Sequence, residues 1–282
     1  MERGSSKTRA VIESASIALL ALLVFMALQV PPLGPGQDRW THYHLLEYAA
    51  VMVIALLAVA LSRRGWAAFG LSAPSLRYHL GLITIGLIPA LILGVALGLL
   101  GWNRWQDAVL LALIQAGLIV ATAWLLRNKP NGSQSLAAGL FLFLATGLFR
   151  ASGTNLGQVL ARVGYVYLLS VPAEEFLFRG YIQSRLNQAF GRPYRFFGVP
   201  WGIGILLSSL LFGLWHLLNP LTFNLLLGQF DLRWLHGLWT FFFGLFLGYF
   251  REKGGSVLAP TVLHGFVNYA PQAIIFDLLG AL

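Results

Sequence analysis

Three short clusters of polar residues lie within or beside long apolar stretches of this 282-residue chain, all beyond position 170. The clusters are Glu174 and Glu175 with Arg179, Phe212 with His216, and His264 with Asn268. Ionisable side chains are expensive to place inside a membrane, so their presence there indicates a functional site. Carboxylate, imidazole and amide groups can activate water and stabilise an oxyanion, which is the chemistry of hydrolysis.

The first cluster places two carboxylates on one helix, one with a basic partner on its own face and one without. Glu175 and Arg179 are four residues apart and share a helix face, so they can form an ion pair that offsets the cost of burial. Glu174 points about 100° away and is not neutralised by this pair. It is therefore a candidate general base or acid. Alternatively, all three charges belong to an interfacial cluster where a helix leaves the bilayer.

The second and third clusters each hold a histidine with a partner four residues away. Phe212 shares a face with His216 and could form one wall of a pocket, although a histidine packed between helices is the alternative. His264 and Asn268 can direct two donors to one point, as an oxyanion site or a metal site requires, or can join helices by hydrogen bonds. The other histidines are expected in solvated or interfacial positions: His42, His44 and His79 in or near loops, and His236 at a span edge.

Composition indicates the environment of these clusters. The chain is 57% hydrophobic and only 10% charged, whereas about a quarter of a soluble domain is charged. Only helices or closed barrels satisfy the backbone in a bilayer, and apolar blocks near 20 residues long predict helices. We therefore predict an all-α, polytopic transmembrane bundle of eight or nine spans. The candidate spans are 11–30, 44–62, 80–101, 107–126, 135–150, 158–178, 201–218, 236–250 and 257–279, the last interrupted by Pro271.

Positive charge alternates between the loops. The basic loops are the N-terminal tail (Arg3, Lys7, Arg9), 63–79, 127–134, the segment after the sixth span (Arg185, Arg192, Arg195) and 251–256. The other loops, at 31–43, 102–106 and 219–235, are nearly balanced in charge. Because cytoplasmic loops carry the excess of Lys and Arg, we predict nine spans with the N-terminus in the cytoplasm.

Charge and cysteine content exclude several functions. The net charge of +9 is spread thinly among apolar blocks, so nucleic acid is not an expected partner. The chain has no cysteine, which excludes disulfides, thiol nucleophiles and cysteine zinc sites. The polar stretch Arg127–Ser135 is the clearest internal break. It separates an N-terminal transmembrane region without recognisable motifs, 1–134, from a predicted catalytic core, 135–282.

The three clusters together resemble the CPBP family, also called the ABI or CAAX protease-like family. The resemblance rests on Glu-Glu-x-x-x-Arg at 174–179, Phe-x-x-x-His at 212–216 and His-x-x-x-Asn at 264–268, and it covers about residues 158–280. The family includes the type II prenyl-protein endoprotease that trims prenylated CAAX proteins, and bacterial relatives linked to bacteriocin self-immunity. The resemblance implies an intramembrane endopeptidase of a bacterial cell membrane, with a membrane-associated peptide or protein as substrate.

The resemblance also implies a role for each motif residue. Glu174 would activate the attacking water, with assistance from His216. His264 and Asn268 would stabilise the oxyanion of the tetrahedral intermediate. The supporting residues are Glu175, Arg179 and Phe212.

A metal and two other functions stay open at this point. Glu174, His216 and His264 could form a three-ligand zinc site with an open position for water, or could work without any cofactor, which we prefer. An ion-coupled transporter also carries charges within its spans, but it would spread them through many spans rather than one half. A non-catalytic scaffold or immunity protein would tolerate replacement of Glu174 by Gln, whereas a peptidase would not.

Overall fold

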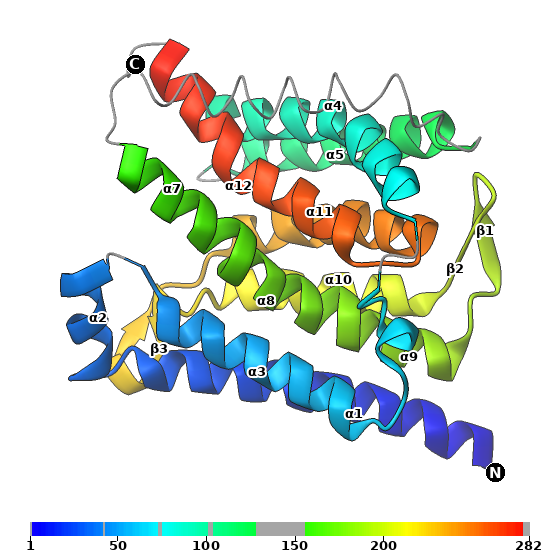
Figure 1. Ribbon diagram of the computed structural model, residues 1–282, viewed down its shortest axis with the longest axis horizontal. Helices are drawn as coiled ribbons and strands as arrows, with labels where there is room; N and C mark the ends of the chain where they lie inside the picture. The colour runs from blue at the N-terminus through cyan, green and yellow to red at the C-terminus, as the bar shows by residue number, and fades with distance from the viewer. Residues whose placement is uncertain (1, 42, 73–74, 101–103, 128–155, 279–282) are drawn as a thin grey trace.

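The computed structural model describes residues 2–41, 43–72, 75–100, 104–127 and 156–278, and within them the chain is a bundle of helices (Figure 1). The helices before the gap are α1 (Glu2–Leu28), α2 (Leu33–Thr41), α3 (Leu45–Leu61), η1 (Trp66–Phe69), α4 (Leu76–Leu100) and α5 (Trp105–Leu125). A continuous helical run from 156 to 190, here called the central helix, consists of α7 (Leu156–Gly164), η2 (Tyr165–Ser170), α8 (Val171–Glu175), η3 (Phe176–Ile182) and α9 (Gln183–Phe190). The helices that follow are α10 (Ile203–Leu217), η4 (Leu225–Leu227), α11 (Trp234–Gly254) and α12 (Leu258–Leu278).

The apolar stretches expected from the sequence correspond to these helices. Before residue 128 the corresponding helices are α1, α3, α4 and α5. After residue 155 they are the central helix, α10, α11 and α12. The stretch expected at 135–150 lies outside the described residues. Helix α2 was not expected, because 31–43 was predicted to be a loop.

Three described helices are long and apolar enough, by length and composition, to cross a membrane: Lys7–Leu28, Leu76–Ala96 and Trp105–Leu125. A fourth is counted if α2 and α3, which meet at 111°, form one broken span, and α10 is a shorter apolar helix. The protein is thus an integral membrane protein, while a total of eight or nine spans stays a prediction. The central helix carries charged residues along its length, and α11 carries three in its last turn, Arg251, Glu252 and Lys253.

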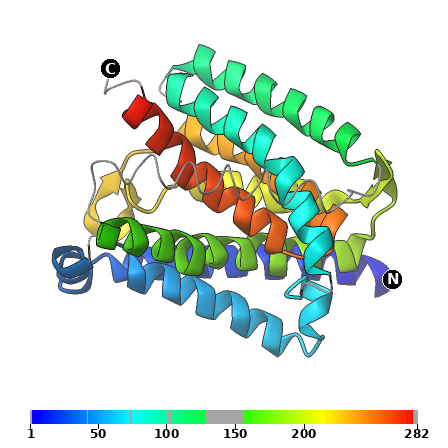
Figure 2. The same cartoon turned by 45° about the horizontal axis from the view of Figure 1, so that its top comes forward.

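The central helix lies inside the bundle. Helix α3 contacts it on one side, together with α1, and α10 and α12 contact it on the other. Helices α4 and α5 pack outside α12 and α11, farthest from α1 and α3. Figure 2 shows the same order from a second direction, with α3 at one side of the molecule and α4 and α5 at the other.

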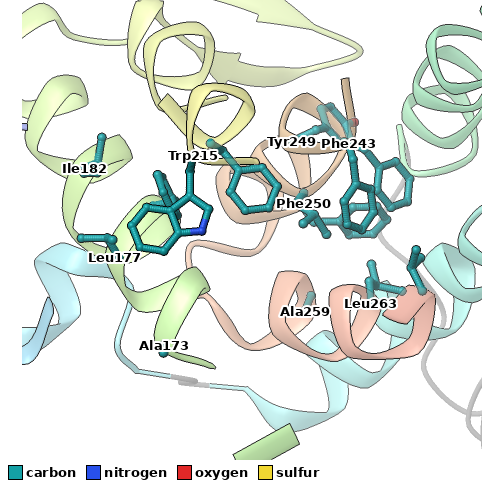
Figure 3. Close-up of a cluster of buried hydrophobic side chains, with 14 of the residues drawn as sticks. Ala173, Leu177, Ile182, Trp215, Phe243, Tyr249, Phe250, Ala259 and Leu263 are labelled. Atoms are coloured by element: carbon teal, nitrogen blue, oxygen red, sulfur yellow. The ribbon is translucent and has the colours of Figure 1, made fainter. Parts of the chain in front are cut away.

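The apolar core joins the two sides of the bundle. Figure 3 shows Leu177 and Ile182 of the central helix, Trp215 of α10 and Phe250 of α11 in one buried cluster, with Leu263 of α12 beside them. Burial of such side chains contributes about 1.5–3 kcal/mol each when complete.

Two short antiparallel hairpins interrupt the helices, which the all-α prediction did not include. In the first, β1 (Tyr194–Phe196) pairs with β2 (Val199–Trp201). In the second, β3 (Phe223–Asn224) pairs with β4 (Gln229–Phe230) around η4. Each lies between two long helices, where a few residues must reverse the chain.

Candidate active site

Glu174 and Glu175 of the first polar cluster lie in α8, between two π-helical segments of the central helix, η2 and η3, and Arg179 lies in η3. Pro172 has no backbone N–H and its ring collides with the preceding turn of a regular α-helix, so the wider turn of η2 accommodates it. In η3, the carbonyl of Phe178 accepts a hydrogen bond of 2.7 Å from the Ser208 hydroxyl of α10. Single π-helical turns frequently occur at functional sites, because they change which way neighbouring side chains point.

Glu175 forms a buried ion pair on this helix and also holds a residue of α12. Nη1 of Arg179 lies 3.0 Å from Oε1 of Glu175, and both side chains are almost fully buried, as the spacing predicts. The same carboxylate oxygen lies 2.8 Å from Nδ1 of His264. An ionised carboxylate can only accept hydrogen bonds, so Nδ1 of His264 carries the proton of this bond.

The other ring nitrogen of His264 points toward Glu174. Nε2 lies 3.7 Å from Oε2 of Glu174, which is too long for a direct hydrogen bond but allows one water molecule to bond both atoms. Both side chains are buried, with exposed fractions of 3% and 7%. Glu174 therefore has attractive charge interactions with Arg179 and His264 and a repulsive one with Glu175.

Phe212 lies among the polar groups. The guanidinium carbon of Arg179 is 4.1 Å from the centre of its ring, the geometry of a cation–π interaction. The rings of His216 and His264 meet its ring edge-on, with centroids 4.4 Å and 5.8 Å away. The residue thus forms one wall of the site, as its spacing from His216 suggested.

His216 is oriented by its own helix. Nδ1 lies 3.0 Å from the carbonyl oxygen of Phe212, so this nitrogen donates the hydrogen bond and Nε2 is left as an acceptor. Helices α10 and α11 approach closely here, because a Cβ on Gly213 would be 2.8 Å from the carbonyl oxygen of Gly237. This approach brings the His236 ring to 5.1 Å from the His216 ring.

These side chains meet at one cavity of about 220 Å³. Glu174, His216, His264 and Asn268 all line it, so the three sequence clusters converge although they come from three different helices. Asn268 is exposed and lies one turn beyond His264 on α12. The complete lining is Phe25, Tyr48, Glu174, Phe212, Trp215, His216, Asn219, Pro220, Leu221, His236, Trp239, Thr240, Phe243, His264 and Asn268.

The sequence did not point to several of these residues. Tyr48 of α3 and Phe25 of α1 line the same cavity as Glu174, although the N-terminal region has no recognisable motif. His236 was expected at a solvated or interfacial position, and it is instead half-buried in the cavity wall. A tyrosine near the start of an apolar span was a usable signal for Tyr48. Nothing in the spacing of His236 indicated its neighbour.

The three possible zinc ligands, Glu174, His216 and His264, all line the cavity. Among the residues that the structure describes, no group of three or more His, Cys, Asp or Glu side chains is placed to hold a metal ion. The structure therefore assigns no metal-binding set to these three residues as they are placed.

Comparison with protein families gives one match. Residues 155–270 match the family model described as Type II CAAX prenyl endopeptidase Rce1-like. No curated protein and no solved structure matches the chain. The matched segment contains all four polar motif residues that line the cavity.

Proposed function

The chain belongs to the CAAX protease (CPBP) family through residues 155–270, and on this premise we propose that it is an intramembrane endopeptidase that cleaves a peptide bond of a membrane-associated substrate. The observation that carries the proposal is the convergence of a carboxylate, two imidazoles and an amide on one cavity between apolar helices. A scaffold does not need ionisable side chains such as Glu174 and His264 buried at a cavity, because the burial of charge costs free energy even when partners are present.

We propose Glu174 as the general base. A water molecule hydrogen-bonded to Glu174 attacks the carbonyl carbon of the substrate, and Glu174 takes the proton that the water loses. The new C–O bond places the negative charge on the carbonyl oxygen. When the C–N bond breaks, Glu174 returns the proton to the leaving amine, so the enzyme regains its starting state. Nε2 of His216, as a hydrogen-bond acceptor, helps to orient the water.

Stabilisation of the oxyanion is assigned to His264 and Asn268. The Asn268 amide is a neutral donor at the exposed side of the cavity. Because Nδ1 of His264 already donates to Glu175, its Nε2 can donate to the oxyanion only when the ring carries a second proton. The positioning of a donor before charge develops is generally the largest electrostatic contribution to such reactions.

The proposal includes an orientation and a location. Basic loops alternate along the chain, which supports a cytoplasmic N-terminus, and a bacterial cell membrane is the location that the family resemblance implies. No step is assigned to a metal ion.

The test is cleavage of a library of membrane-anchored peptides by purified protein in liposomes. Wild type is compared with Glu174→Gln and His264→Ala, and with Glu13→Gln as a matched control, since Glu13 pairs with Arg185 far from the cavity. We expect the first two variants to lose cleavage by about 10²–10⁴-fold and the control to retain it.

Each outcome has a clear meaning when the variants remain folded by thermal unfolding. Cleavage that survives Glu174→Gln overturns the assigned base. A wild type that cleaves no peptide, in liposomes or in cells expressing the same library, favours the scaffold or transporter function.

A further inference from the structure

Positive charge gathers at one end of the bundle. We call this the basic end, and it carries Lys7, Arg9, Arg63, Arg64, Arg185, Arg192, Arg195, Arg251 and Lys253. Contacts between helices tie these residues together. Arg185 pairs with Glu13 of α1 at 2.7 Å, Arg192 pairs with Glu252 of α11, and Arg64 bonds Gln188. In Figure 1, the N-terminus, α9 and the β1–β2 hairpin lie together at this end.

The cavity lies toward the opposite end. Its lining includes Phe25 near the end of α1 and Tyr48 near the start of α3. It also includes Asn219, Pro220 and Leu221, directly after α10, and His236 in the first turn of α11. The start of α1, the end of α3, the start of α10 and the end of α11 are all at the basic end, so the cavity and the basic end are on opposite sides of the bundle. Figure 1 shows α2 and β3 at the end away from the N-terminus.

Charge at the cavity end is balanced among the described residues. Arg233 pairs with Asp231 at 2.9 Å, and Arg104 pairs with Asp107 at 2.7 Å. Lys and Arg in short loops mark the cytoplasmic side of a membrane protein. The difference between the ends therefore assigns the basic end to the cytoplasm and the cavity end to the other face.

An apolar hairpin stands beside the cavity. The segment 221–234 begins at Leu221 in the cavity lining and contains β3, η4 and β4. Its exposed apolar side chains are Leu221, Leu225, Leu226, Leu227, Phe230 and Trp234, of which Leu226 is 62% and Phe230 66% exposed. The buried side chain of Asn224 fixes the hairpin by donating to the carbonyl of Met26 and to Gln29, at 3.0 Å and 2.9 Å. Exposed leucines with aromatic residues at a helix end are typical of a segment seated in the membrane interface.

We propose that the cavity opens on the extracytoplasmic face of the membrane, and that the β3–β4 hairpin is seated in the outer leaflet beside it. The substrates of the protein are then peptide segments presented at the extracytoplasmic interface of this membrane. The statement about substrates rests on the proposed peptidase function, whereas the orientation does not. A peptide anchored in that leaflet would reach Glu174 by passing the hairpin rather than by crossing the basic end.

The absence of cysteine makes a direct test possible, because a single cysteine can be introduced without removing any other. Gln229→Cys in the hairpin and Ala67→Cys in η1 are matched, since both positions are exposed and lie at opposite ends. Cells expressing each variant are treated with a membrane-impermeant maleimide before and after permeabilisation. We expect Gln229→Cys to be labelled in intact cells and Ala67→Cys only after permeabilisation.

The reverse pattern, or equal labelling of both variants in intact cells, overturns the proposal. If neither residue reacts after permeabilisation, a tag on the N-terminus gives the second measurement, and its digestion by protease added to intact cells also overturns the proposal. A polarity-sensitive fluorophore on Leu226→Cys in liposomes tests the hairpin. Quenching by spin-labelled lipid is expected, and its absence contradicts the seated hairpin. Each measurement is repeated with Glu174→Gln, which should give the wild-type labelling and quenching pattern because neither depends on cleavage. A wrong orientation therefore changes the labelling, whereas a missing peptidase activity changes only the cleavage assay.

Discussion

Nδ1 of His264 lies 2.8 Å from Oε1 of Glu175, although the two residues are 89 positions apart in the chain. The same oxygen lies 3.0 Å from Nη1 of Arg179. One carboxylate oxygen thus holds a guanidinium from its own helix and an imidazole from α12. Glu175 joins the two helices that carry Glu174 and His264, and it also determines which nitrogen of His264 faces the cavity.

Glu175→Gln should strongly destabilise the protein. The substitution leaves the buried guanidinium of Arg179 without its counter-ion, and breaking a buried pair costs about 3–5 kcal/mol. We expect a lower Tm by thermal unfolding in detergent, with loss of cleavage. Glu13→Gln is the matched control, because its partly exposed pair with Arg185 should contribute about 1 kcal/mol or less. Equal Tm values for the two variants would contradict the role given to Glu175.

Tyr48→Phe should slow cleavage without unfolding the protein. Tyr48 and Glu174 line the same cavity, where the hydroxyl can donate to the carboxylate during the reaction. A hydrogen bond to a charged group contributes about 1.5–3 kcal/mol, or roughly 10- to 100-fold in rate. The effect is expected in kcat, with KM and Tm nearly unchanged. Tyr43→Phe is the control, since Tyr43 stacks on Tyr165 at 4.5 Å and is not among the lining residues. A wild-type kcat for Tyr48→Phe would remove Tyr48 from the site.

Gly265→Ala should displace His264, the residue that precedes it. A Cβ at this position would be 2.4 Å from Cε1 of Tyr167, so the Tyr167 ring or α12 must shift, and we expect α12 to move. We expect a loss of about 1–3 kcal/mol in unfolding free energy, together with reduced cleavage because His264 moves relative to Glu175. Gly117→Ala in α5 is the control, because a Cβ there meets nothing within 4 Å. That control should be neutral or slightly stabilising, and a similar loss in both variants would argue against close packing as the cause.

Removal of metal should leave cleavage intact. No group of three suitable donors is placed around a common point among the described residues, and the rings of His216 and His264 both pack on Phe212. We expect the same rate in a strong chelator and no stoichiometric zinc by elemental analysis. Loss of activity in chelator, with recovery on addition of zinc, would show that the cavity rearranges around a metal ion.

The predicted helices and much of the site were accessible from the sequence. Long apolar blocks predict spans because the bilayer requires about 20 apolar residues and satisfied backbone bonds. Helical spacing alone placed Glu175 beside Arg179 and Phe212 beside His216, because residues four apart share a face. The two hairpins and α2 were missed, since short segments between helices carry little periodic signal.

Tyr48, Phe25 and His236 were missed as cavity residues for a reason that differs from that for the hairpins. Each enters the cavity from a helix whose sequence says nothing about its neighbours. Close approach of α10 to α11 at Gly213 and Gly237 decides that His236 reaches His216. Such contacts depend on the distance between helices, which no pattern within a single helix records.

The sequence by itself determined that this is a helical membrane protein with intramembrane polar residues in a family-specific order. Local spacing and hydropathy are properties of the chain alone, so they can be determined without a three-dimensional structure. Only the tertiary structure decided that Glu174, His216, His264 and Asn268 share one cavity, and that the cavity lies away from the basic end. Those relations arise from packing between helices that are distant in the chain, where shape and burial rather than sequence spacing determine which side chains meet.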